Sequence, residues 1–177
     1  MAIPSNYLVV KTSTIPGSGK GLFTKKFIPA GTRIAEYTGK VSTWKDANHE
    51  DGDNGYIYYV KRNHVIDAKA DKNSIARYAN DARGLTRVKG ITNNCEYIEE
   101  GTRVYIHAKK DIEAGSEILV PYGSEYWQVI RYNRNLALKE ATTREKAAKK
   151  KKAREKAARK KTSRNITSVE KLYKKRA

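Results

Sequence analysis

The last 42 residues of the chain, from Leu136 to Ala177, limit most strongly what this sequence can fold into. They hold 17 Lys and Arg against 4 Asp and Glu, and so 13 of the 18 net positive charges of the 177-residue chain. From Lys139 to Lys161 almost every residue is Ala, Lys, Arg or Glu, which favours helix but forms no sustained apolar stripe. The hydrophobic core must therefore come from residues 1–135. We expect residues 136–177 to be a Lys/Arg-rich tail that is helical or disordered.

Cysteine, histidine and the N-terminal residues exclude several classes of protein. The single Cys95 excludes an internal disulfide and a cysteine-rich zinc cluster. His49, His64 and His107 have no second ligand at metal-binding spacing, so we expect no metal site. The apolar run Tyr7–Val10 is too short for a signal peptide or a membrane span. We therefore expect an intracellular protein that does not bind membranes.

The first 135 residues favour β-structure over helix. Short runs rich in β-branched and aromatic residues predict strands over residues 7–11, 33–38, 56–60, 64–67 and 103–109. A helix is expected only near the end of this part, over residues 124–135. The domain is therefore predicted to be mostly β.

Two segments carry patterns that favour a ligand site. The segment Gly17–Phe23 reads GSGKGLF, and its three alternate glycines allow the backbone to approach a ligand closely. Taken alone it is also typical of a flexible hairpin turn. It is not a dinucleotide fingerprint, because no helical pattern follows it. The second segment, Ala76–Asp81, reads ARYAND and follows later in the chain.

A third segment, Asp111–Trp127, reads DIEAGSEILVPYGSEYW and presents a tyrosine between two residues that interrupt strands. Its apolar run Ile118–Val120 stops at Pro121, and Gly123 permits an unusual backbone conformation. Tyr122 is therefore expected at a fixed angle rather than packed within a sheet.

In this order, the three segments resemble the SET domain, the fold of S-adenosylmethionine-dependent protein lysine methyltransferases. The resemblance runs from about Tyr7 to about Tyr132. It implies a SET domain within residues 1–135, in a minimal form without zinc-binding flanks. It further implies a mostly β fold of small sheets, with the last segment threaded under the ARYAND region in a knot-like core that departs from the usual rule against threading.

The resemblance also implies the catalytic residues. Tyr122 matches the catalytic tyrosine, and Tyr37 and Tyr97 match residues that line the lysine channel. Seen alone, Tyr37 is equally typical of a packed strand tyrosine. Tyr97 stands where Tyr or Phe tunes how many methyl groups fit, and its hydroxyl implies mono- or dimethylation.

The cofactor implied is S-adenosylmethionine, and Asn80 matches the asparagine whose amide holds it. Asp81 departs from the family, which usually has histidine there. Trp127 either lies against the adenine or anchors the predicted helix to the sheet. The residues expected to bind the cofactor are Gly19, Lys20, Gly21, Leu22, Arg77, Tyr78, Asn80, Asp81 and Trp127.

The polar segment Lys45–Asn54 lies where the family has a variable substrate-binding insert. Its acidic residues Glu50, Asp51 and Asp53 are expected either to attract a basic peptide or to form a solvated loop. The expected partners are a basic, histone-like protein substrate and nucleic acid bound through the tail, in a nucleus or in a bacterial cytoplasm or nucleoid.

Two further hypotheses stay open at this point. One is a non-catalytic SET scaffold that binds nucleic acid or chromatin. The other is that the tail is itself methylated, because its lysines are tethered near the site. The sequence predicts neither the oligomeric state nor the target lysine.

Overall fold

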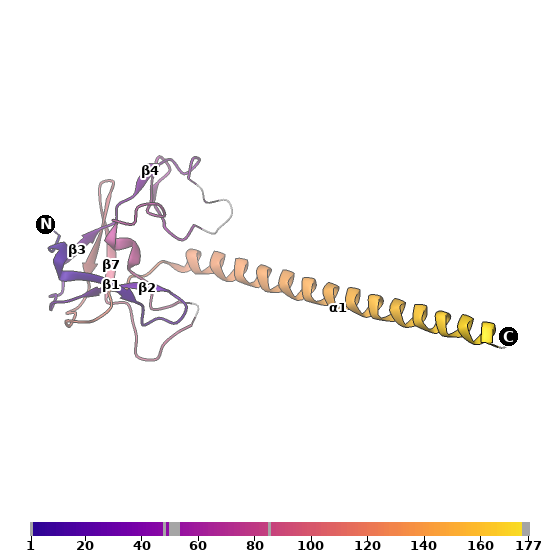
Figure 1. Ribbon diagram of the computed structural model, residues 1–177. Coiled ribbons are helices and arrows are strands. Elements are labelled where there is room, and N and C mark those ends of the chain that lie inside the picture. Colours follow the sequence, from indigo (N-terminus) through magenta and orange to yellow (C-terminus); the bar gives the residue numbers. More distant parts are fainter. Residues whose placement is uncertain (1, 48, 50–53, 85, 175–177) are drawn as a thin grey trace. The chain divides into compact units, whose positions relative to one another are not determined.

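The computed structural model describes residues 2–47, 49, 54–84 and 86–174, with side chains described up to residue 156. The chain divides into two compact units, Met1–Ile130 and Arg131–Ala177. Figure 1 shows the sheets of the first unit and the long helix, most of which forms the second unit. Each unit is described by itself.

The first unit contains three small antiparallel sheets, with short 3-10 turns at Ser5–Tyr7 and Ile75–Tyr78. The sheets are β1 (Leu8–Thr12) with β2 (Lys20–Thr24), β3 (Arg33–Glu36) with β8 (Arg103–Ala108) and β7 (Cys95–Glu100), and β4 (Lys40–Ser42) with β6 (His64–Asp67) and β5 (Ile57–Lys61). The prediction of a mostly β fold built from small sheets is confirmed.

The longest hairpin joins β7 and β8 through a two-residue turn. Glu100 pairs with Arg103, which leaves Gly101 and Thr102 to reverse the chain. Gly101 has φ +65°, which only glycine adopts at little steric cost. The hairpin register places Tyr97 opposite Ile106, so the turn fixes where this tyrosine lies.

The segment Ile118–Val120 lies at the centre of the core and pairs with residues from three other parts of the chain. The N–H of Ile118 donates to the carbonyl of Leu22 at 2.7 Å, and the N–H of Val120 donates to that of Asn80 at 2.8 Å. The N–H of Cys95 donates to the carbonyl of Leu119 at 2.9 Å. This fully buried segment therefore joins the two sequence patterns GSGKGLF and ARYAND in space. The knot-like threading itself stays a prediction.

Some elements differ from those expected. The glycine segment is half strand, because β2 begins at Lys20 and pairs with β1 in a hairpin. Strands β4 and β7 were not predicted, since β4 has three residues and β7 carries three glutamates that hide its apolar face. Helix α1 (Ser124–Lys174) continues far beyond the predicted end at residue 135.

In the second unit, α1 is exposed wherever its side chains are described beyond Asn133. Ion pairs one turn apart, Lys149 with Glu145 at 2.6 Å and Arg144 with Glu140 at 3.8 Å, support the helix locally. The tail was expected to be helical or disordered, and the structure shows its described part as a helix. The predicted boundary at residue 135 lies inside α1 and stays a prediction. None of the described helices combines the length and the apolar character that a membrane span requires.

Candidate active site

Two hollows lie next to each other in the first unit. The first has a volume of about 490 Å³ and the second of about 600 Å³, both within the range of small-molecule sites. Gly55, Arg77, Tyr122 and Tyr126 line both of them. The two hollows therefore adjoin at these four residues, and a group bound in one lies close to a group bound in the other.

Tyr122 is held at both ends by the segment that follows the 3-10 turn Ile75–Tyr78. Its hydroxyl donates to the carbonyl of Ala79 at 2.8 Å, and its backbone N–H donates to Oδ2 of Asp81 at 2.9 Å. Gly123 has φ +92°, a backbone conformation that turns the chain away after the paired residues 118–120. Burial raises the pKa of Tyr122 well above its ordinary value, so its phenol stays protonated at neutral pH.

Three tyrosines from three different strands or strand ends form a cluster in the second hollow. The ring centroids of Tyr37 and Tyr97 lie 6.0 Å apart, those of Tyr37 and Tyr58 5.9 Å, and those of Tyr58 and Tyr97 5.0 Å. Burial raises the pKa of all three phenols. The structure thus brings the predicted pair Tyr37 and Tyr97 together with Tyr122 around one hollow.

Tyr58 and Tyr126 are site residues that the sequence did not reveal. Tyr58 sits in β5 and donates to Oε1 of Glu99 at 3.1 Å. Tyr126 lies in the first turn of α1 and packs edge-on against Tyr122 at 4.8 Å between centroids. The richness in tyrosine of residues 56–59 and 122–126 was the available signal, but pattern alone does not show which of these rings share a hollow.

The glycine segment forms one wall of the first hollow. Gly17 has φ +81° and Gly19 has φ +68°, so both turns need glycine, and a Cβ atom at either would meet open space. Lys20 also lines the hollow, and its carbonyl accepts a hydrogen bond from the Nδ2 of Asn80 at 3.0 Å. Asn80 itself lines the same hollow, which brings together two segments that the sequence placed far apart.

The predicted residues Gly21 and Leu22 lie behind this wall. Leu22 is fully buried in the core, and its carbonyl is paired with Ile118. Gly21 packs against the side chain of Glu117. Neither residue lines the hollow, and their part in cofactor binding stays a prediction.

Glu117 is a third residue that the sequence analysis missed. It is 5% exposed and accepts hydrogen bonds from the Ser13 hydroxyl at 2.7 Å, the Thr14 backbone N–H at 2.7 Å and the Thr14 hydroxyl at 2.5 Å. It also accepts one from the Nδ2 of Asn80 at 3.1 Å. The buried side chain of Glu117 thus ties the residues just before the glycine segment to Asn80. Because Glu117 lies in a pattern typical of a turn followed by a strand, the local sequence did not indicate these contacts.

Trp127 lines the first hollow, whereas Asp81 does not line it and is bonded to Trp127 instead. A contact of Asp81 with the cofactor stays a prediction. Asp81 is 2% exposed, and the Nε1 of Trp127 donates to its Oδ2 at 2.7 Å. Trp127 is buried, lines the hollow and stacks on Tyr122 with ring centroids 5.9 Å apart and an interplanar angle of 13°. Trp127 is thus buried at the start of α1 and also lines the hollow, and its contact with the adenine stays a prediction.

Arg77 lies where the two hollows meet. Its guanidinium lies over the ring of Tyr56 at 4.2 Å, and its Nη1 donates to the carbonyl of Lys69 at 3.0 Å. Within the described chain, its Nε is buried without a hydrogen-bond acceptor in range. Because Arg77 lines both hollows, the charge of its guanidinium suits an anionic group such as a carboxylate there. Tyr78 lines the first hollow beside it.

The predicted acidic residues Glu50, Asp51 and Asp53 lie outside the described residues. Two other carboxylates, Glu96 and Glu125, line the second hollow. Across the described ranges, no three His, Cys, Asp or Glu side chains come together in a group that could hold a metal ion.

The family comparison agrees with the fold. The family model for the SET domain matches residues 19–123, which is more than half of the chain. The protein belongs to the SET domain family.

Curated relatives and a solved structure extend this comparison. The chain is similar to the histone-lysine N-methyltransferase set-17 of Caenorhabditis elegans, with 26% identity over 66% of this chain and 41% of that protein. It is also similar to the histone-lysine N-methyltransferase ASHH1 of Arabidopsis thaliana, with 32% identity over 68% of this chain and 25% of that protein. It thus spans less than half of either relative.

The fold resembles that of the methyltransferase domain of human PR domain-containing protein 2. The TM-score is 0.50 at 23% sequence identity, and the match covers 69% of this chain and 80% of that domain. This likeness concerns the arrangement of the sheets.

Proposed function

We propose that this protein is an S-adenosylmethionine-dependent protein lysine N-methyltransferase. The observation that carries the proposal is the junction of two hollows at Tyr122, one lined by the glycine segment and Asn80, the other by an aromatic cluster. A transferase that moves a methyl group between two substrates requires two sites that meet at the reacting atoms. Membership of the SET domain family supports this assignment.

The first hollow fits S-adenosylmethionine by its size and its donors. Gly17 and Gly19 leave room for close backbone approach, and the positive charge of Arg77 suits the carboxylate of the cofactor. Asn80 and Trp127 would form the remaining walls. When bound, the cofactor supplies an electrophilic methyl group on a positively charged sulfur.

The second hollow suits the aliphatic stem and amine of a lysine. The rings of Tyr37, Tyr58 and Tyr97 would pack against the methylene groups and exclude water. A free lysine amine has a pKa of about 10.4, and its burial among these rings lowers that pKa and favours the neutral nucleophile. The same rings tolerate a methylated ammonium product through cation–π attraction.

Tyr122 would orient the amine rather than remove its proton. Its phenol keeps its proton, because burial raises its pKa, and it donates that proton to the carbonyl of Ala79. The oxygen lone pairs then remain available to accept a hydrogen bond from the incoming amine. The nucleophile therefore has to arrive already neutral.

We further propose that mono- or dimethylation is favoured. In the second hollow, Tyr97 contacts both Tyr37 and Tyr58 edge-on, so its hydroxyl and the surrounding rings restrict the room for a bulkier amine. This rests on the family resemblance at Tyr97. Intact-mass analysis of the product checks it, and efficient trimethylation would contradict it.

The substrate class proposed is a basic, histone-like protein. Two carboxylates, Glu96 and Glu125, line the second hollow in a chain of net charge +18. They would attract basic residues that flank the target lysine. The names of both curated relatives describe histone-lysine methyltransferases, which agrees with this class.

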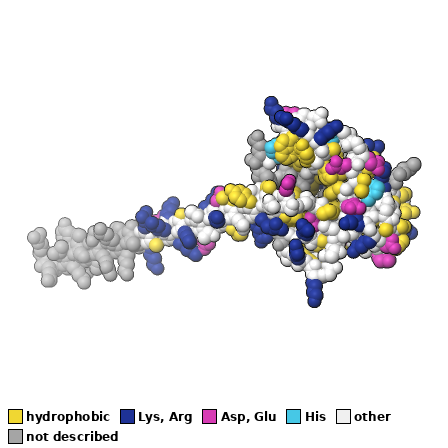
Figure 2. Space-filling view, turned by 180° about the vertical axis from the view of Figure 1, so that it is seen from behind, with side chains coloured by type: hydrophobic (Ala, Val, Ile, Leu, Met, Phe, Trp, Pro, Cys, Tyr) yellow, Lys and Arg dark blue, Asp and Glu magenta, His cyan; other side chains and the backbone are white. Residues whose placement is uncertain are grey.

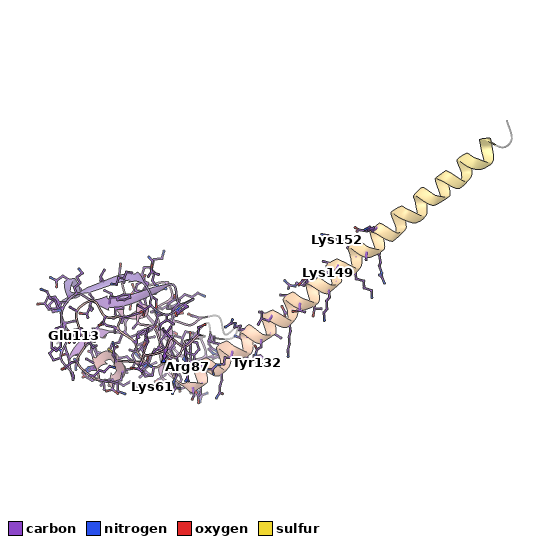
Figure 3. All side chains as sticks on the ribbon, turned by 90° about the horizontal axis from the view of Figure 1, so that it is seen from below. Lys61, Arg87, Glu113, Tyr132, Lys149 and Lys152 are labelled. Carbon is purple, nitrogen blue, oxygen red and sulfur yellow. The ribbon has the colours of Figure 1, made fainter. Side chains whose placement is uncertain are left out.

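The basic helix would hold the protein on nucleic acid near such a substrate. Figure 2 shows Lys and Arg side chains along the described part of α1. Lys149 and Lys152, labelled in Figure 3, are exposed. Contacts of this kind with phosphates are independent of base sequence and weaken steeply with salt. A nuclear, chromatin-bound or nucleoid location follows from such contacts.

The proposal is tested by transfer of a labelled methyl group from S-adenosylmethionine to histones, ribosomal proteins and the enzyme itself. Lysine-specific label on a basic protein supports it, and label on the enzyme alone indicates that the tail is the substrate. The second candidate, a non-catalytic scaffold, is favoured by the exposed cationic face of α1. It predicts no saturable heat of binding when S-adenosylmethionine is titrated into the protein.

A further inference from the structure

The carboxylate of Asp81 is buried without a cationic partner in the part of the chain that the structure describes. It is 2% exposed and takes part in none of the ion pairs of the described residues. Such a group is costly to bury unless hydrogen bonds replace its lost water. Asp81 therefore needs an explanation of its own.

Four hydrogen-bond donors surround this carboxylate. Its Oδ2 accepts from the indole Nε1 of Trp127 at 2.7 Å and from the backbone N–H of Tyr122 at 2.9 Å. Its Oδ1 accepts from the backbone N–H of Arg83 at 2.8 Å and from the Nδ2 of Asn93 at 2.9 Å. An ionised carboxylate is an acceptor with about four lone-pair sites, so these four donors fill it. In an asparagine at this position, the amide NH₂ group would face two of these N–H donors and could accept neither hydrogen bond.

The hydrogen bonds decide the charge of Asp81. Burial alone raises the pKa of Asp81, but the hydrogen bonds from Trp127, Tyr122, Arg83 and Asn93 outweigh it and hold the pKa below its ordinary value. Asp81 is therefore ionised at neutral pH, which is the state that accepts all four bonds.

These bonds reach the two rings that line the first hollow. Trp127 has its indole nitrogen fixed, and Tyr122 has its backbone fixed by the same oxygen and its hydroxyl fixed by Ala79. The two rings are nearly parallel, and Asn80 lines the same hollow. No other described side chain bonds to both Tyr122 and Trp127.

We propose that Asp81 is a positioning residue that sets Trp127 against the cofactor hollow and Tyr122 at the junction of the two hollows. It does so through the hydrogen bonds of its side chain and without touching the reacting atoms. The proposal rests on the methyltransferase function proposed above. It assigns to one oxygen, Oδ2 of Asp81, the task of fixing both a wall of the cofactor site and the residue that would orient the amine. The other oxygen, Oδ1, holds Asp81 itself in place through Arg83 and Asn93.

The test uses the full-length chain with Asp81→Asn, Trp127→Phe and the double variant, all in a Trp44→Phe background so that Trp127 is the fluorescent reporter wherever it is kept. Asp111→Asn is the matched control, because Asp111 is exposed and caps the N–H of Ala30 on another part of the domain. Circular dichroism first establishes that each variant is folded. Trp127→Phe keeps an aromatic ring and the other three bonds of Asp81, so it keeps the test usable if Asp81→Asn does not fold.

We expect Asp81→Asn to weaken S-adenosylmethionine binding about 10-fold, to lower kcat by about 10- to 100-fold, and to shift the emission of Trp127. The KM for the peptide should stay within about 2-fold, since Tyr37, Tyr58 and Tyr97 come from other segments of the chain. The double variant should bind the cofactor no more weakly than the weaker single variant, because both substitutions break the same bond. Asp111→Asn should change none of these values.

The positioning role is overturned if the losses in cofactor affinity add in the double variant, or if Asp81→Asn binds the cofactor like the wild type with unshifted emission. A rise in the peptide KM as large as the loss of cofactor affinity would also overturn the role, because it indicates a general structural defect. If the wild-type protein itself neither binds S-adenosylmethionine nor transfers methyl groups, the methyltransferase function fails. The emission of Trp127 then still tests whether Asp81 holds the indole.

Discussion

Gly21 and Glu117 pack so closely that a Cβ atom on Gly21 would lie 2.2 Å from the Oε1 of Glu117. Real Cβ atoms do not approach another heavy atom this closely, so the small size of Gly21 is what admits the carboxylate. Glu117 in turn accepts the hydrogen bonds that tie Ser13, Thr14 and Asn80 together. The stability of this arrangement and its effect on the first hollow can be measured separately.

Glu117→Gln should lower the free energy of unfolding by about 1–3 kcal/mol, because the amide sets an N–H group against buried donors. Urea denaturation followed by circular dichroism measures this change. Glu113→Gln is the matched control and should stay within about 0.5 kcal/mol, since Glu113, labelled in Figure 3, is exposed on the same connection. Equal stability of the two variants would show that the Glu117 cluster is not a stabilising feature.

Tyr122→Phe should reduce kcat by about 10²- to 10³-fold, the usual cost of removing one positioned polar group from a catalytic site. The ring would still stack on Trp127, so S-adenosylmethionine affinity measured by calorimetry should change little. Tyr132→Phe is the control, because Tyr132 is 68% exposed. A parallel loss of cofactor binding would assign Tyr122 to binding instead of methyl transfer.

Tyr97→Phe should shift the product toward higher methylation, because removal of the hydroxyl enlarges the space beside the amine. Intact-mass spectrometry of the peptide product gives the distribution directly. Tyr58→Phe serves as the comparison, since the hydroxyl of Tyr58 is bonded to Glu99. The same shift in both variants would mean that the hollow responds to any missing hydroxyl and that Tyr97 has no special part.

Low pH should destabilise the fold through Asp81. Its pKa is lower in the folded state than its ordinary value, so its contribution to stability is complete above the unfolded pKa of about 3.9. That contribution is lost as the pH falls through the lower, folded pKa. Between pH 7 and pH 2, the melting temperature of the wild type should therefore fall more steeply with decreasing pH than that of Asp81→Asn. The same dependence of the melting temperature on pH in both proteins would contradict this prediction.

Replacement of Lys149–Lys152 by glutamine should reduce the salt dependence of duplex DNA binding. For each phosphate that the variant no longer neutralises, the slope of log affinity against log salt becomes shallower by about 0.9. Four exposed lysines of the first unit, replaced together, form the control: Lys25, Lys26, Lys40 and Lys69. Fluorescence anisotropy at several salt concentrations measures both sets. A larger effect of the control set would place nucleic-acid binding on the folded domain.

Much of the fold and part of the site could be predicted from local patterns. Short runs rich in β-branched and aromatic residues predicted β6 and all of β8, and the break at Pro121 and Gly123 predicted that Tyr122 lies outside the sheets, as it does. The charge and composition of residues 136–177 predicted that they add nothing to the core, and their described side chains are exposed. Each of these features depends on neighbours within a few residues, which is why sequence alone determined them.

What only the tertiary structure decided is which distant residues meet. Glu117 and Asp81 are ordinary acidic residues in the sequence, and nothing near them predicts that one accepts bonds from Ser13 and Asn80 and the other from Trp127. Tyr58 and Tyr126 likewise gained a role only when β5 and α1 met around Tyr122. A buried carboxylate is defined by donors that folding brings from across the chain, and their positions are set by packing rather than by local propensity.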